Sequence, residues 1–282
     1  MKFHLISDIH ADINPWDWQT LSHLDTSMPM VVAGDINNDV MGTSRWLREL
    51  RKMFSTVIWV AGNHDFYNSG FQKTRLSDPV FDQAWPYPQT VAEIYDHYQR
   101  WSDHHGIHFL NRSSVIVDNV QFVGATGWHN FDAAAYLPFE SQVSAWQKSM
   151  SDSHCCDWDH DEPYQAVLEA ARLDADYIRD AVKANDLPKV VVTHHIPQKE
   201  FVKVTTDLEW NLLNGSFLNT WLSDCLHPSI GAWCFGHTHY RTYKNHLGID
   251  FVNNARGYSH ENASWQPVEI EIDTRAISSQ PT

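Results

Sequence analysis

Short apolar runs recur along the chain, and five of them stop abruptly at a glycine or a polar residue. The five runs are Phe3 to Ile6, Met30 to Ala33, Val57 to Ala61, Val190 to Val192 and Ala232 to Phe235. A short, β-branched apolar run with such boundaries is typical of a buried strand, often in a parallel sheet. Because helical patterns separate several of these runs, the sequence predicts βαβ units.

Segments with helical spacing or turn signals lie between the runs. We expect helices at about 16–24, 44–54, 89–104, 163–184 and 216–226. The fourth of these begins with Pro163, which suits the first turn of a helix. Asp118 and Asn119 stand between two apolar stretches and predict a hairpin turn. A last pair of strands is expected near 249–253 and 267–272.

Three irregular stretches interrupt this alternation, at about 66–88, 129–162 and 197–214. The first carries three prolines, and the second is rich in Asp, Ser, His and aromatic residues. We interpret all three as insertions into one domain that covers residues 1–275, and the second as an insertion or a lid beside the site. Residues 276–282 are expected to form a frayed tail.

The charge balance is acidic, with 20 basic residues against 35 acidic ones and a net charge of -15. This excess argues against duplex nucleic acid as a partner, because clustered Lys and Arg are needed to capture it. A small anionic substrate is compatible with this charge if bound cations supply positive charge locally. No stretch is apolar enough to span a bilayer, and we find no signal peptide. Four cysteines, two of them adjacent, predict a reduced, cytoplasmic setting.

A block of potential metal ligands follows each of the five apolar runs. The blocks are Asp8-Ile9-His10, Gly34-Asp35, Gly62-Asn63-His64-Asp65, His194-His195 and Gly236-His237-Thr238-His239. In open α/β sheets, ligands bind outside the carboxyl ends of the strands. Five strand ends would therefore deliver Asp, His and Asn side chains to one crevice. Oxygen and imidazole donors in that number suit two divalent cations rather than one.

The order of these blocks resembles that of the calcineurin-like metallophosphoesterases, and the match spans residues 8 to 239. The resemblance implies an α/β fold, a four-layer α/β/β/α sandwich of two mixed sheets flanked by helices. It also implies a dinuclear metal centre. The ligands carried over for the first cation are Asp8, His10, Asp35 and His239. The ligands carried over for the second cation are Asp35, Asn63, His194 and His237.

The family also implies a reaction. Two divalent cations are expected, manganese first, with iron, zinc, nickel or cobalt as alternatives. A hydroxide that bridges the cations would attack phosphorus in line with the leaving oxygen, and His64 would be the catalytic histidine that is not a ligand. A looser resemblance connects three stretches with a bacterial Ser/Thr-phosphatase-like branch of the family, namely Phe122 to Trp128, Val192 to Pro197 and Ala255 to Tyr258.

Residues near these blocks are expected to support the centre. Asn38, Asp65 and His195 should lie beside the ligands. Many relatives place a carboxylate or His three residues after the bridging Asp, where it orients the catalytic His. Asn38 occupies this position here, and its carbonyl could accept from the His64 imidazole without contributing a charge.

Two further residues are candidates for substrate binding. Arg256 either contacts a substrate anion or forms a salt bridge, and His129 either faces the substrate or packs. The second insertion also contains a cluster of His, Cys and Asp that matches no zinc spacing and is interpreted as a solvated acidic loop. This cluster comprises His154, Cys155, Cys156, Asp157, Asp159 and His160.

We expect hydrolysis of phosphodiesters, including nucleotide-like ones. A diester leaves only one anionic oxygen to bind, and the insertions carry few basic residues. Hydrolysis of phosphomonoesters, as by a protein or small-molecule phosphatase, is the alternative. A non-catalytic protein-binding scaffold should have lost a ligand or the catalytic His, and a nuclease should have a basic track. The sequence leaves the natural substrate and the oligomeric state open.

Overall fold

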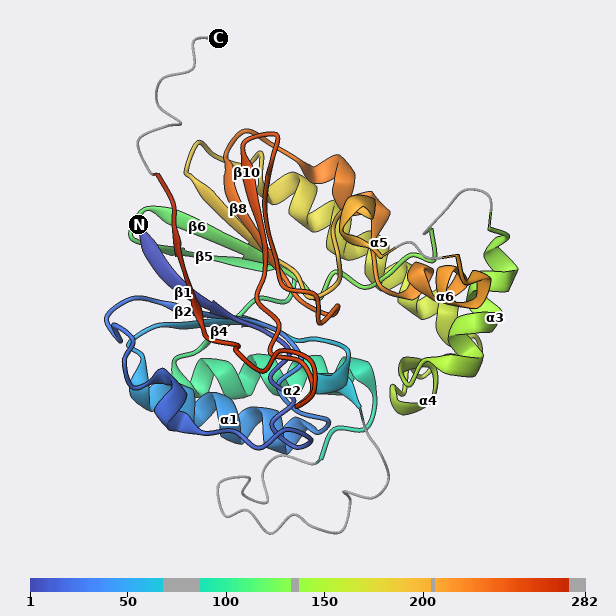
Figure 1. The fold of residues 1–282 in the computed structure, drawn as a ribbon, viewed down its shortest axis with the longest axis horizontal. Helices are drawn as coiled ribbons and strands as arrows, with labels where there is room; N and C mark the ends of the chain where they lie inside the picture. Colours follow the sequence, from blue (N-terminus) through green and yellow to red (C-terminus); the bar gives the residue numbers. More distant parts are fainter. Residues whose placement is uncertain (68–86, 133–136, 204–205, 274–282) are drawn as a thin grey trace.

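Two sheets lie face to face, with helices on their outer sides, in the computed structural model (Figure 1). The structure describes residues 1–67, 87–132, 137–203 and 206–273. The first sheet has the strand order β11 (Val268–Glu271), β1 (Lys2–Ile6), β2 (Met30–Ala33), β3 (Val57–Val60) and β4 (His108–Phe109). The second has the order β5 (Ser113–Val117), β6 (Val120–Gly124), β7 (Lys189–Val192), β8 (Ile230–Phe235), β10 (Ile249–Asn253) and β9 (Thr242–His246).

Most neighbouring strands are parallel, and both sheets are mixed. In the first sheet β11 runs antiparallel to β1. In the second sheet β5 runs antiparallel to β6, and β9 runs antiparallel to β10. The expected sandwich of two mixed sheets flanked by helices is therefore confirmed.

Helices cover the outer face of each sheet and form a further group beside the sandwich (Figure 1). The α-helices are α1 (Val40–Met53), α2 (Val91–His105), α3 (Phe139–Ser149), α4 (Asp152–Cys155), α5 (Pro163–Ala181) and α6 (Leu208–Leu213). The 3-10 helices are η1 (Trp18–Leu21), η2 (His64–Phe66), η3 (Lys199–Phe201), η4 (Asn214–Ser216) and η5 (Thr220–Cys225). Among the described helices, none is both long enough and apolar enough to cross a bilayer.

The apolar runs are continuous because both faces of their strands are buried. Val31 belongs to the core between the two sheets, whereas its neighbour Val32 belongs to the core beneath α1 and α2. In the second sheet, Val190 faces the first sheet and Val191 shares a core with α5. Side chains alternate along a strand, so a strand buried on both faces needs an apolar residue at each position.

Two expected helices are shorter than predicted. The stretch 16–24 forms only η1, because its tryptophans Trp16 and Trp18 pack against Trp46, with ring centroids 5.3 and 5.2 Å away, respectively. The stretch 216–226 contains the end of η4 and then η5. Leu218 interrupts it by forming a bridge to Ile196.

The insertions contain more regular structure than the sequence indicated. The stretch 129–162 includes α3 and α4, and the stretch 197–214 includes η3 and α6. The expected last pair of strands exists as β10 and β11, but they lie in different sheets. Strands β4 and β9 were not predicted, since β4 is very short and β9 is polar. Most of the 66–88 insertion and the 276–282 tail lie outside the described residues.

Candidate metal centre

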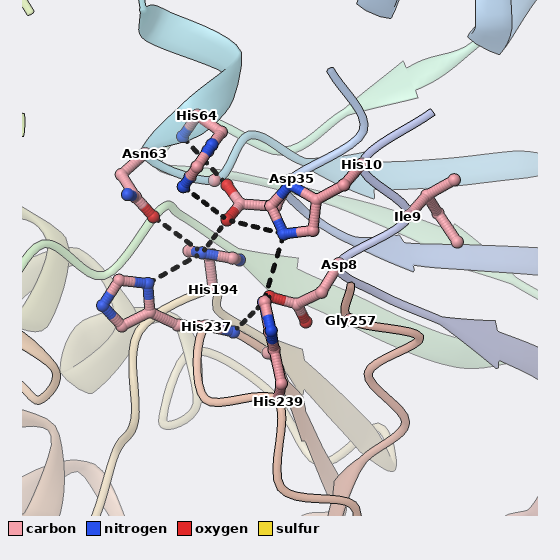
Figure 2. A network of polar contacts seen from close by, with 12 residues as sticks. Asp8, Ile9, His10, Asp35, Asn63, His64, His194, His237, His239 and Gly257 are labelled. Carbon is pink, nitrogen blue, oxygen red and sulfur yellow. Dashed lines mark hydrogen bonds and ion pairs between the residues drawn. The ribbon is translucent and has the colours of Figure 1, made fainter. Parts of the chain in front are cut away.

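The ends of five strands bring the predicted ligands to one place (Figure 2). Strands β1, β2 and β3 of the first sheet precede three of the ligand blocks, and β7 and β8 of the second sheet precede the other two. All seven candidate ligands are at least half buried, and most have almost no exposed surface. These seven residues are Asp8, His10, Asp35, Asn63, His194, His237 and His239.

The first group of ligand atoms lies between β1 and the loop after β8. The Nε2 atoms of His10 and His239 are 3.1 Å apart. His239 Nε2 lies 3.7 Å from Asp8 Oδ1, and His10 Nε2 lies 3.8 Å from Asp35 Oδ2. Ligand atoms around a shared cation at about 2.1 Å are separated by roughly 3–4 Å, so these spacings fit one metal ion.

The second group centres on His194 Nε2. This atom lies 3.0 Å from Asn63 Oδ1, 3.2 Å from His237 Nδ1 and 3.3 Å from Asp35 Oδ2. Asp35 Oδ2 therefore contacts members of both groups, as a carboxylate shared by two cations would (Figure 2).

Hydrogen bonds at the outer edges of these side chains direct lone pairs toward the centre. His194 Nδ1 donates to the carbonyl oxygen of Ala33 at 2.8 Å, which leaves Nε2 without a proton in the neutral ring. His237 Nε2 lies 3.3 Å from the carbonyl oxygen of Ser216, which leaves Nδ1 facing inward. Lone pairs of nitrogen and carboxylate oxygen that converge in this way need a cation between them, so the donor set fits the metals that the family implies.

The pKa values of the imidazoles agree with a cationic occupant. Burial lowers the pKa of His10 to about 3, which keeps this ring in the neutral, ligating form. Burial also opposes a charge on His194, but the carboxylates of Asp35 and Asp8 outweigh it and raise its pKa to about 9. A cation bound beside these carboxylates would take the place of the His194 proton.

The backbone at the strand ends adopts unusual conformations that bring the ligands inward. Asp8, His10, Asp35 and His237 all have positive φ angles, between 44° and 71°. Such residues cluster at functional sites, where the surrounding structure holds them in place. Gly62 makes room for the shared carboxylate, because a Cβ atom at this position would lie only 2.2 Å from Asp35 Oδ1.

His64 lies beside the first group, and one of its ring nitrogens comes within 4.8 Å of ligand atoms of His10 and Asp35. Its Nδ1 donates to Asn38 Oδ1 at 2.5 Å, as the sequence suggested, and its Nε2 is 3.9 Å from Asp35 Oδ2. Asp65 accepts hydrogen bonds from the backbone N–H groups of Asp35 and Gly62, both at 2.9 Å, and so joins two of the ligand loops. These contacts fix His64 and Asp35 relative to each other.

The structure does not bring the two candidate substrate-binding residues to the centre. Arg256 donates to the carbonyl oxygens of Ile9, Asn14 and Pro15 at 2.8–2.9 Å, and it forms no salt bridge with the residues that the structure describes. His129 has no exposed surface and packs against Phe131, with ring centroids 4.5 Å apart.

Two residues that hold ligand side chains in position were not predicted from the sequence. Glu261 Oε2 accepts from His239 Nδ1 at 2.5 Å, the carboxylate–histidine pair that commonly orients a metal ligand. Asp152 Oδ1 accepts from Asn63 Nδ2 at 2.7 Å, which turns the Asn63 carbonyl toward the second group. His195, expected beside the ligands, is fully buried and lies 4.3 Å from the His237 ring. No spacing rule connects Glu261 or Asp152 to the motifs.

A cavity of about 760 Å³ opens onto the centre. Asp35, Asn63, His64, His237 and His239 line its inner end. About half of its other lining residues are aromatic or apolar, among them Tyr67, Met150, Trp210, Phe217, Tyr240 and Tyr258. A phosphate at the centre would thus have room for a larger attached group.

Comparisons with known proteins agree with this geometry. The family model for calcineurin-like phosphoesterases matches residues 1–241, which is most of the chain. The protein belongs to the calcineurin-like phosphoesterase family. It is therefore a hydrolase of phosphate esters, in a family that depends on a dinuclear metal centre.

The chain is also similar to two further proteins, one by sequence and one by structure. An uncharacterised protein of Acanthamoeba polyphaga mimivirus is 25% identical over 262 residues, which cover 88% of this chain and 85% of the relative. The crystal structure of phosphopantetheinyl hydrolase from Mycobacterium tuberculosis superposes with a TM-score of 0.76 and 18% identity. That match covers 100% of this calcineurin-like phosphoesterase and 98% of the neighbour, and it shows a common fold.

Proposed function

We propose that this phosphoesterase hydrolyses phosphodiesters at a centre of two divalent cations. The observation that carries the proposal is the pair of ligand groups that share Asp35 Oδ2 beneath an open cavity. Asp8, His10, Asp35 and His239 would hold one cation, and Asp35, Asn63, His194 and His237 the other. When bound, the cations would lower the pKa of water and withdraw electron density from the phosphoryl group.

The chain's own residues supply positioning and proton transfer. Asn38 holds Nδ1 of His64, so Nε2 faces the cavity and can hand a proton to the leaving oxygen. Glu261 and Ala33 fix the rings of His239 and His194 from behind. These contacts hold the reacting groups in place before the substrate arrives.

The cavity walls favour diesters. Apart from histidines, Lys203 and Arg241 are the cationic residues among the described lining residues, and Glu261 adds a negative charge. Lys203 Nζ also donates to the Tyr240 hydroxyl at 2.6 Å. A monoester carries a second anionic oxygen and needs more positive charge nearby than a diester. Phosphomonoester hydrolysis is the alternative if Lys203 and Arg241 both reach the phosphate.

Relative turnover of two nitrophenyl substrates tests the preference. We expect the metal-loaded enzyme to hydrolyse bis-p-nitrophenyl phosphate with a kcat/KM at least about tenfold above that for p-nitrophenyl phosphate, a difference of about 1.4 kcal/mol. A higher kcat/KM for p-nitrophenyl phosphate than for bis-p-nitrophenyl phosphate, with the monoester preference reduced in Arg241→Gln, would establish phosphomonoester hydrolysis instead. Because the solved neighbour is named for phosphopantetheinyl hydrolysis, the panel also includes a phosphopantetheinylated protein.

A further inference from the structure

Three more side chains of the metal-ligand type lie in the interior beside the dinuclear centre. His129 follows β6, His195 follows β7, and Asp152 is the first residue of α4. All three have a fractional exposure of 0%. One nitrogen of each imidazole and one carboxylate oxygen of Asp152 lie within 4.8 Å of one another. None of the three belongs to the ligand groups described above.

These side chains lack hydrogen-bond partners. In the part of the chain that the structure describes, both ring nitrogens of His129 and His195, and Oδ2 of Asp152, make no hydrogen bond. Each buried polar atom without a partner costs about 1–3 kcal/mol, so several in one place are a heavy penalty. A bound group among them would reduce this penalty by pairing with one lone pair on each ring and with Oδ2 of Asp152.

The chemistry of the donors favours a cation over a water molecule as this group. Each neutral imidazole offers one lone pair, and Asp152 Oδ2 offers another. A cation accepts all three at once, whereas a water molecule has only two hydrogen atoms to donate. Burial lowers the pKa of His129 to about 3, so its ring is in the neutral form that binds metals.

We propose that His129, Asp152 and His195 form a third metal site, distinct from the dinuclear centre. Two imidazoles and one carboxylate match the donor set of many zinc sites, so a divalent transition metal, with Zn²⁺ first, is the expected occupant. Bond lengths of about 2.1 Å place ligand atoms about 3.4 Å apart. This spacing is within the 4.8 Å that bounds the present separations of the three ligand atoms.

This site would be structural and would position a ligand of the dinuclear centre. Asp152 Oδ1 accepts from Asn63 Nδ2 at 2.7 Å and from the Tyr67 hydroxyl at 2.5 Å, while Oδ2 makes no hydrogen bond within the described part of the chain. A cation on Oδ2 would fix the carboxylate and, through it, the orientation of the Asn63 amide. The aromatic rings of Phe131 and Trp146, 4.5 and 5.7 Å from His129, separate the site from solvent.

Metal counting on the full chain tests the proposal without using activity. The protein is reconstituted with excess Zn²⁺, freed of unbound metal and analysed by mass spectrometry for zinc per chain. We expect about three equivalents in the wild type and about two in His129→Phe, whose new ring suits the aromatic surroundings. His129→Asn is the second variant if His129→Phe does not fold. His4→Gln is the matched control, because His4 is also buried with an unpartnered nitrogen but contacts Asp25 and Phe54.

A variant of the dinuclear centre separates this proposal from the proposed function. Asp35→Asn should lose about two equivalents of zinc per chain and keep about one. The double variant His129→Phe/Asp35→Asn should lose this remaining equivalent as well. The Co²⁺-loaded forms give a second readout, because Asp35→Asn should retain a visible absorption band that the double variant lacks. Two equivalents in the wild type, unchanged in His129→Phe, would overturn the third site and leave the dinuclear centre intact.

Discussion

The dinuclear centre and the His129–Asp152–His195 cluster use the same residue types but are assembled differently. Every proposed ligand of the dinuclear centre follows the end of a strand, so the two sheets determine where it lies. The cluster combines two such strand-end histidines with Asp152, which comes from a four-residue helix in an insertion. The comparison shows that the sheets place the reactive groups, whereas the insertion supplies groups that hold them in position.

Removal of the shared carboxylate should have the largest effect. Asp35→Asn takes a charged ligand from both groups, so we expect the loss of both cations and a fall in kcat/KM of at least about 10³-fold. Steady-state kinetics and metal analysis provide the measurement. Asp25→Asn is the control, since Asp25 bonds Ser27 on the surface. Substantial turnover by Asp35→Asn would contradict the assignment of Asp35 as the bridging ligand.

Removal of His64, the proposed proton donor, should have the next largest effect and should leave the metals in place. We expect His64→Ala to lower kcat by about 10²–10⁴-fold, because it removes general acid catalysis. The loss should be greater for an alkyl leaving group than for nitrophenolate, which needs less protonation. His23→Ala, at an exposed position, is the control. An equal loss for both leaving groups would exclude His64 as the proton donor.

A substitution of Asp152 tests whether the 129–162 insertion helps to hold the ligand Asn63 in position. In Asp152→Asn the carboxylate that accepts from the Asn63 amide becomes neutral. We expect the affinity for the second cation to fall by about 10–100-fold, as is typical when a group behind a ligand is lost. Titration of the metal-free protein measures this affinity, with Asp161→Asn, an exposed change in the same insertion, as the control. An unchanged affinity would mean that the strand ends alone suffice.

The smallest expected effect is a pH dependence of the free energy of unfolding, caused by a buried carboxyl group beside the second sheet. Asp174 on α5 accepts from the backbone N–H groups of Gly127 and Trp128, in the loop that leads to His129. Burial raises the pKa of Asp174 from 3.8 to about 6. The folded state therefore binds this proton more tightly than the unfolded state does, and the contribution of Asp174 to stability falls as the pH rises through that range.

This pH dependence should disappear in Asp174→Asn. Between about pH 5 and about pH 7.5, the free energy of unfolding of the wild type should fall by roughly 1 kcal/mol relative to that of the variant. Urea unfolding at several pH values provides the measurement. Parallel curves for the two proteins would show that the Asp174 carboxyl does not keep its proton in the folded state.

Sequence patterns predicted the parts of this molecule that depend on local rules. The strand before Asp35 is apolar, short and followed by glycine, so its burial follows from the pattern. The placement of Asp35 beyond the carboxyl end of this strand follows from the rule for open α/β sheets. The order of the ligand blocks then indicated the family. The two mixed sheets came from that resemblance, since βαβ alternation alone does not specify them.

The remaining features depend on contacts between distant segments. Asp152 meets Asn63 across 89 residues, and Arg256 meets Ile9 across 247, and no local pattern encodes either pairing. The segment with Trp16 and Trp18 was expected to be helical, but aromatic packing against Trp46 limits it to η1. Tertiary contacts of this kind override local helix propensity.

The central claim is that two cations held by these strand ends make the chain a phosphoesterase. The most direct test is to strip the protein of metal with a chelator and return Mn²⁺ while following bis-p-nitrophenyl phosphate hydrolysis. We predict no turnover by the stripped protein and recovery only after at least about two equivalents have bound. Full activity without metal, or a fully metallated protein that leaves every phosphate ester intact, would contradict the account.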